Sequence, residues 1–238
     1  MQSSADLGGT FSRAWQLLSG NWIIAVPAII IGVAGGIIIE IVSKAFIGGG
    51  LVTGNFGAIM LGGLLTVAIA TILQILTVGM TTGMGVTAWR TGTADFADGT
   101  AVFSNGGAMQ TLLLWMAIGV VLAFIPLLGW IADVVLMFLL IYAVPAAVAT
   151  GAGAGAAFSE SVNIVTKNFL TTLIIIALIF VIGICGAIAG GVLTFVPFLG
   201  KIVAEIIQQV ILAYGTLVIV GEYLKIRAVG TASAPPSP

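Results

Sequence analysis

The chain has no histidine and only one cysteine among its 238 residues. A His-based catalytic triad, a His metal site and a His-ligated haem are therefore excluded, and Cys185 cannot form an intrachain disulfide or a cysteine cluster. The G-x-S-x-G and G-x-x-x-x-G-K-[ST] motifs are also missing from the sequence. These absences predict a protein that is not an enzyme and that carries no metal or other cofactor.

Charge is equally scarce. Only 6% of the residues are charged, the net charge is −1, and 60% of the residues are hydrophobic. A water-soluble domain has about a quarter of its residues charged, so the solvent of this chain must be lipid. Nucleic acid is excluded as a partner, because its recognition requires a clustered Lys/Arg surface.

Long apolar runs alternate with short polar breaks, and about 20 apolar residues suffice to cross the hydrocarbon core as a helix. The first run is longer than the apolar region of a signal peptide and lacks a small-residue cleavage site, which favours a retained transmembrane helix. We expect six spans, at Trp22–Val42, Phe56–Trp89, Thr111–Ile125, Trp130–Thr150, Phe169–Phe195 and Ile202–Val220.

Six spans place both termini on one side of the membrane. The positive-inside rule makes that side the cytoplasm, because it holds five basic residues (Arg13, Arg90, Lys167, Lys225 and Arg227) against Lys44 and Lys201 on the other side.

Two sequence motifs occur twice. The segment from Phe11 to Trp22 matches that from Phe158 to Phe169 in its Phe-Ser start and Asn-aromatic end, and 124–131 resembles 195–202 around a Pro-x-Leu-Gly break. The first pair has the apolar spacing of a short helix lying in the membrane interface, with Leu7, Phe11, Trp15, Leu18 and Trp22 on one face. A weaker version is formed by Phe96, Thr100 and Phe103.

The expected fold is therefore all-α and polytopic, with about six transmembrane helices arranged as three hairpins, each preceded by a short interfacial amphipathic helix. Residues 1–230 would form a single transmembrane domain of three parallel repeats at 7–91, 94–150 and 156–228. Residues 231–238 would form a disordered tail, because they are rich in Ala, Ser and Pro.

Each hairpin carries one acid near its non-cytoplasmic end: Glu40, Asp133 and Glu205. Charged groups within spans are costly and often functional, which makes these acids candidates for an ion or ligand site. Structural pairing is the alternative, because Glu40 and Lys44, like Lys201 and Glu205, are four residues apart on a helix. Asp133 has no partner in the neighbouring sequence.

Glycine is abundant, with 33 residues, and three G-x-x-x-G spacings occur. Small residues let helices approach closely in lipid, and we expect these pairs to serve packing within the chain rather than dimerisation. The pairs are Gly32/Gly36, Gly79/Gly83 and Gly186/Gly190.

The repeated segments and the polytopic body, over about residues 7–228, resemble a broad group of prokaryotic six-helix membrane proteins. This group includes the membrane domain attached to glycerophosphodiester phosphodiesterases and the YciC-like proteins. The resemblance implies a membrane architecture in the prokaryotic inner membrane. It carries over no functional residue, because the phosphodiesterase activity of the fused relatives resides in a separate soluble domain that has no counterpart in this sequence.

Three functions are compatible with this sequence. The first is a non-catalytic integral membrane scaffold or an accessory subunit of a membrane assembly, in contact with the lipid bilayer and with other membrane proteins or further copies of itself. The alternatives are a small transporter or channel that uses the intramembrane acids, and a lipid-handling membrane protein. The two alternatives differ from the first in requiring either a wet cavity around the acids or a lateral groove for lipid.

Overall fold

The computed structural model describes residues 7–123, 125, 128–193, 195–196 and 199–232, and helices are the regular elements found in these residues. Their order begins with α1 (Leu7–Gly20), a 3-10 turn η1 (Trp22–Ala25), α2 (Val26–Val42), a π-helical stretch η2 (Ser43–Gly48), α3 (Gly49–Thr53) and α4 (Phe56–Thr91). It continues with α5 (Phe96–Ser104), α6 (Gly106–Ala123), α7 (Leu128–Leu139), α8 (Ala143–Thr150), α9 (Ala154–Lys167), α10 (Phe169–Leu193) and α11 (Leu199–Ala232).

The protein is an all-α polytopic membrane protein. In the described part of the chain, five helical segments are long and apolar enough to cross a membrane, and α5 with α6, bent by 81°, would make a sixth. The five segments are Trp22–Thr53, Phe56–Thr91, Ile131–Thr150, Phe169–Leu193 and Leu199–Val229.

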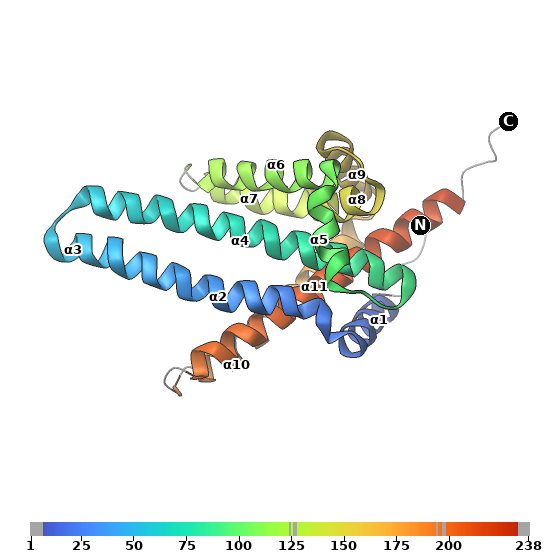
Figure 1. The fold of residues 1–238 in the computed structure, drawn as a ribbon. Coiled ribbons are helices and arrows are strands. Elements are labelled where there is room, and N and C mark those ends of the chain that lie inside the picture. Colours follow the sequence, from blue (N-terminus) through green and yellow to red (C-terminus); the bar gives the residue numbers. More distant parts are fainter. Residues whose placement is uncertain (1–6, 124, 126–127, 194, 197–198, 233–238) are drawn as a thin grey trace.

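The long helices pack as three consecutive pairs, which we call the hairpins α2–α4, α6–α7 and α10–α11. In each hairpin the end of the first helix and the start of the last helix lie at the same end of the molecule (Figure 1). The short helices α1, α5, α8 and α9 gather at the opposite end, where α11 ends (Figure 1). We call this end the base and the end with the hairpin turns the outer end. Helices α4 and α11 are central, since α4 packs against α2, α5, α6 and α8, and α11 packs against α1, α2, α4 and α10.

The buried core lies at the base. Apart from Gly62, the buried residues of α4 fall between Ile75 and Ala88. Two clusters form there. One joins α1 to α4 and α11 through Leu17, Met84 and Leu217, and the other joins α5, α6, α8 and α9 through residues that include Leu112, Tyr142 and Val165. The outer halves of the hairpins therefore meet mainly lipid or one another.

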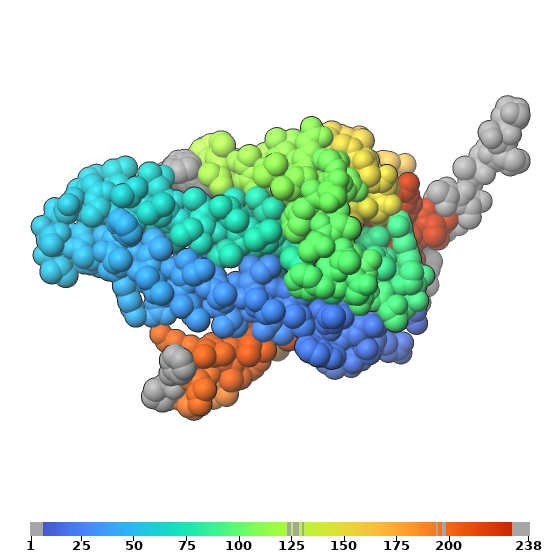
Figure 2. Space-filling view, viewed as in Figure 1, coloured from blue at the N-terminus to red at the C-terminus, as the bar shows by residue number. Residues whose placement is uncertain are grey.

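The α2–α4 hairpin is longer than expected. The first span does not end at Val42 but continues through η2 and α3 to Thr53, and the 36 residues of α4 extend over about 54 Å at 1.5 Å per residue. This hairpin reaches beyond the ends of α6–α7 and α10–α11 (Figures 1 and 2). Its end, residues 45–65, contains no charged residue; we call it the outer tip.

The fourth expected span is not one continuous helix. It breaks between Leu139 and Ala143, where Ser161 of α9 donates its hydroxyl to the Leu139 carbonyl at 2.8 Å and accepts the Tyr142 N–H at 3.1 Å. Pro145 contributes to the break, because proline lacks the N–H that would continue the helical ladder. Sequence periodicity could not reveal this break, since the hydroxyl that bonds to the interrupted backbone groups comes from another helix.

The helices α1 and α9 present matching faces to the protein. When Phe11 is aligned with Phe158, the buried positions of α1 coincide with four of the five buried positions of α9. In both, an asparagine ends the helix by donating its side-chain amide to the carbonyl four residues earlier: Asn21 to Leu17 at 3.3 Å, and Asn168 to Ile164 at 3.0 Å. The aligned buried sets are Thr10, Ala14, Leu17 and Leu18, and Ala157, Ser161, Ile164 and Val165.

The face expected to be apolar on α1 packs on the protein in part: Leu18 is buried, and Leu7 and Phe11 pack against the same core cluster. Trp15 and Trp22 are 58% and 71% exposed, while Thr10 and Ala14, on the adjoining face, are buried. The two tryptophans therefore lie largely outside the core, where the membrane interface would accommodate them.

Five of the six G-x-x-x-G glycines lie against neighbouring helices of the same chain. A Cβ at Gly83 would come within 2.6 Å of the Asp98 carbonyl oxygen, and one at Gly190 would lie 3.2 Å from the Ala204 Cβ. Packing within the chain therefore explains them, as expected. The remaining close contacts are at Gly32, Gly79 and Gly186, whereas Gly36 has open space.

Two of the sequence-based expectations concern residues that lie outside the described part of the chain. The Pro-x-Leu-Gly breaks include residues 126–127 and 197–198, and most of the expected tail is 233–238. The last helix continues past the expected Val220 to Ala232, so Thr231 and Ala232 belong to α11 and not to a disordered tail.

Candidate functional site

Glu40 lies on α2, exposed near the outer end. Its carboxylate accepts a hydrogen bond from Lys44 Nζ at 2.6 Å, as the spacing predicted, and Lys201 Nζ of α11 lies 4.0 Å away. The second contact connects the α2–α4 hairpin to the α10–α11 hairpin. It could not be predicted from spacing, because the two residues lie on different hairpins.

Glu205 is partly buried on α11. Its carboxylate accepts a hydrogen bond from Gln209 Nε2 at 2.7 Å, one helical turn further on. Lys201, the partner expected from the sequence, lies instead within ion-pair distance of Glu40. The hydrogen bond replaces part of the hydration that the carboxylate loses on partial burial.

Glu40 and Glu205 share one cavity. It has a volume of about 490 Å³ and lies between α2, α10 and α11, with Lys201 and Gln208 also on its wall. Two acids and the two lysines Lys44 and Lys201 give this region a balanced formal charge. The rest of the wall is apolar or small: Val33, Gly36, Ile37, Ala187, Gly190, Gly191, Ile202 and Ala204.

Asp133 lies apart from the other two acids. It lines a separate cavity of about 290 Å³ between α4, α6 and α7, whose wall also includes Thr71, Gln74 and Trp115. The carboxylate is exposed, and its Oδ1 lies 3.8 Å from the position of a Cβ built at Gly119. The three acids therefore do not converge on a single central point.

A third cavity lies between the first two. It has a volume of about 350 Å³, shares Glu205 with the cavity of Glu40, and shares Gln74 with the cavity of Asp133. Gln209 also lines it, and the buried Gln209 Oε1 has no hydrogen-bond partner among the described residues. Polar side chains thus follow one another from Glu40 through Glu205 and Gln74 to Asp133, within an otherwise apolar bundle.

The position of Asp133 along the bundle can be measured on α4. Asp133 shares its cavity with Thr71, which lies nineteen residues before Arg90 on α4, or about 28 Å at 1.5 Å per residue. The hydrocarbon core is about 30 Å thick. With Arg90 at one boundary of the hydrocarbon, Asp133 therefore lies close to the opposite boundary, where a carboxylate can reach water.

The three acids cannot serve together as ligands of one metal ion. No group of three Cys, Asp or Glu residues with metal-binding geometry occurs in the described part of the chain. The interactions that Glu40 and Glu205 make are hydrogen bonds and charge pairing. Cys185 lies elsewhere, exposed on α10.

The sequence identified the acids but not how they are grouped. The i,i+4 spacing of Glu205 and Gln209 was a signal for their hydrogen bond. Thr71 and Lys201 gave no comparable signal, because their roles depend on how the hairpins pack.

No family model, curated protein or solved structure matches the chain. The fold and the apolar helices define an integral membrane protein of the all-α polytopic class.

Proposed function

We propose that the protein is a non-catalytic accessory subunit or scaffold of a membrane assembly, and that the outer tip is the surface through which it meets its partner. The observation that carries the proposal is the combination of length, exposure and absence of charge in residues 45–65. Leu51, Val52 and Phe56 are 67%, 88% and 70% exposed.

The position of the tip makes this exposure costly. Along α4, Phe56 lies fifteen residues beyond Thr71, about 22 Å at 1.5 Å per residue, and Thr71 already lies at the level of Asp133. A tip at this height extends past the hydrocarbon into the headgroups or the water. Each large apolar side chain left in water costs about 2 kcal/mol relative to burial, so a covering partner stabilises the tip, and contiguous exposed apolar patches commonly mark such contacts.

The test is photocrosslinking in the native membrane. A photoreactive phenylalanine analogue at position 52 should give a discrete protein adduct, whereas the same analogue at position 192 should give lipid adducts only. Val192 is the matched control, since it is 63% exposed and lies on α10, outside the outer tip. An adduct of twice the chain's mass would identify the partner as a second copy.

Stoichiometry completes the test. In native mass spectrometry after mild extraction and without crosslinking, Val52→Ser should lose the partner that crosslinking identified, and Val192→Ser should retain it. The absence of a protein adduct at position 52, or equal retention by both variants, would contradict the proposal.

A small transporter or channel is the second candidate, and the chain of cavities from Glu205 through Gln74 to Asp133 favours it. In proteoliposomes, a transporter would carry protons or monovalent cations faster than empty vesicles do, and Asp133→Asn and Gln74→Leu should abolish the difference. A wild-type protein that behaves as empty vesicles do would eliminate this candidate.

We also propose that the base faces the cytoplasm of a prokaryotic cell. The chain would then consist of three parallel repeats and share the architecture of the six-helix family. Support for the orientation comes from the basic residues at the base, and support for the repeats comes from the matching faces of α1 and α9. Asn105, between α5 and α6, occupies the place that Asn21 and Asn168 hold before the other two hairpins. Reporter fusions to the C-terminus that are active only outside the cytoplasm should remain inactive.

A further inference from the structure

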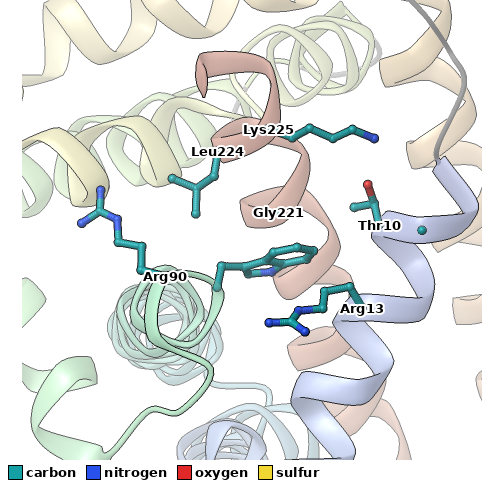
Figure 3. A pocket seen from close by; sticks show the side chains of 8 residues that line it. Thr10, Arg13, Arg90, Gly221, Leu224 and Lys225 are labelled. Atoms are coloured by element: carbon teal, nitrogen blue, oxygen red, sulfur yellow. The ribbon is translucent and has the colours of Figure 1, made fainter. Parts of the chain in front are cut away.

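A second polar site lies at the base, on the opposite side of the membrane domain from the acids. It is a cavity of about 450 Å³ formed where α1, the end of α4 and the last third of α11 meet. Arg13, Arg90 and Lys225 line it, one from each of these helices. Figure 3 shows Arg13 and Lys225 on either side of Thr10, with Arg90 across the gap on α4.

The charge at this site is unbalanced. The buried Glu222 contacts the cavity wall, since its carboxylate accepts the hydroxyl of the lining residue Thr10 at 3.0 Å. Three cations against one carboxylate leave an excess of positive charge. Arg90 is partly engaged, because it donates to the Ala149 carbonyl at 2.9 Å, whereas Arg13 is exposed and makes no hydrogen bond or ion pair with the described residues.

The cavity also has a fixed apolar wall. Trp89 donates its indole N–H to the Leu217 carbonyl at 2.8 Å, and its ring lies directly on Gly221, where a Cβ would collide with it. Tryptophan at the membrane interface presents an apolar ring at the level of the lipid headgroups. The site thus combines guanidinium and ammonium groups with an interfacial apolar surface, at the end of the bundle where the spans begin.

We propose that this cavity binds the phosphate of an anionic phospholipid headgroup. Guanidinium groups match phosphate oxygens in a bidentate manner and lysine adds a point charge. Basic pockets between transmembrane helices on the cytoplasmic side are typical sites for anionic headgroups. Inorganic phosphate has the same chemistry, but an open, solvated site holds a small free anion weakly, whereas a lipid is already concentrated in the plane of the membrane. The inference goes beyond the proposed subunit role and does not depend on it.

The test measures lipid binding by the full chain in nanodiscs of phosphatidylcholine that contain a minor fraction of phosphatidylglycerol. Native mass spectrometry should show bound phosphatidylglycerol on the wild type. Arg13→Gln should weaken this binding about fivefold, and Arg13→Gln with Lys225→Gln should weaken it further, since each cation contributes about 1 kcal/mol near an anionic surface. Lys167→Gln is the matched control, because Lys167 is also an exposed cation at the base, on α9, but does not line the cavity.

Three results would overturn the assignment. Unchanged binding by Arg13→Gln would exclude the cavity, and an equal loss in Lys167→Gln would mean a general surface-charge effect. If inorganic phosphate bound to the protein in pure phosphatidylcholine discs and displaced phosphatidylglycerol, the natural ligand would be a free phosphate and not a lipid. An unchanged thermal midpoint in Arg13→Gln would confirm that the variant is folded.

Discussion

The base and the outer end of this molecule are held together by different interactions. At the base, buried polar groups from distant parts of the chain bond to one another, as Thr10 does to Glu222 at 3.0 Å and Ser161 to Leu139 at 2.8 Å. Away from the base, the α2–α4 and α10–α11 hairpins meet where Gln209 lies on Gly32 and at the exposed pair of Glu40 with Lys201. The short helices make the difference, because they add a second layer around α4 and α11 at the base only. Stability should therefore be concentrated at the base, while the outer hairpins can adjust to lipid or to a partner.

The largest expected effect comes from adding one methyl group at the base. Gly83→Ala should lower the free energy of unfolding by about 3 kcal/mol, because the new Cβ would meet the Asp98 carbonyl and force α5 away from α4. Gly183→Ala on α10 is the matched control and should be neutral or slightly stabilising, since its Cβ would meet open space. Denaturant titration in mild detergent measures both, and equal effects would remove the distinction between the two regions.

The next effect concerns the broken span. Ser161→Ala should cost about 2 kcal/mol, because it leaves the Leu139 carbonyl and the buried Tyr142 N–H without their partner. Ser159→Ala, at an exposed position of the same helix, should change the unfolding free energy little. A loss in Ser161→Ala no larger than in the control would show that the hydroxyl does not stabilise the break.

A smaller effect is expected between α2 and α11. Gly32→Ala should cost about 1 kcal/mol, because the Gln209 carboxamide lies directly on Gly32 and would have to leave its hydrogen bond with Glu205. In a Gln209→Ala background the same change should cost nothing. If the cost persists in that background, the glycine supports backbone contact rather than the position of the glutamine.

The smallest effect is expected at the exposed ion pairs. Glu40→Gln should leave the thermal midpoint unchanged, since the side chains of Glu40 and Lys44 are 48% and 76% exposed and such pairs contribute little. A clear drop in the midpoint at low salt that disappears at high salt would mean that the contact with Lys201 holds two hairpins together. Polar contacts would then stabilise the outer end as they stabilise the base, contrary to our inference.

Composition and periodicity were enough for the fold class and for most spans. Phe56–Trp89 was expected and α4 runs from Phe56 to Thr91. An uninterrupted apolar run in lipid has few alternatives to one continuous helix, because the helix satisfies its own backbone hydrogen bonds. The continuation of the first span to Thr53 was missed, since the ion pair at Glu40 and Lys44 resembled a helix end. The break before Ala143 was missed because it depends on a hydroxyl from α9.

The candidate site was less accessible to sequence reasoning. The acids could be found by type and position, yet their distribution over separate cavities follows from the packing angles of the hairpins. The basic cavity at the base was missed for the same reason: Arg13, Arg90 and Lys225 lie far apart in the sequence, and each one alone is an ordinary interfacial cation. Only the crossing of α1, α4 and α11 brings them together.

The exposure of Cys185 has a practical consequence. Because it is the sole thiol of the chain and lies on the surface of α10, a spin label or fluorophore can be attached there without first removing other cysteines. Its mobility reports on the lipid-facing side of the α10–α11 hairpin. Paired with a second label introduced at the base, it would measure directly how far the outer end moves while the base stays fixed.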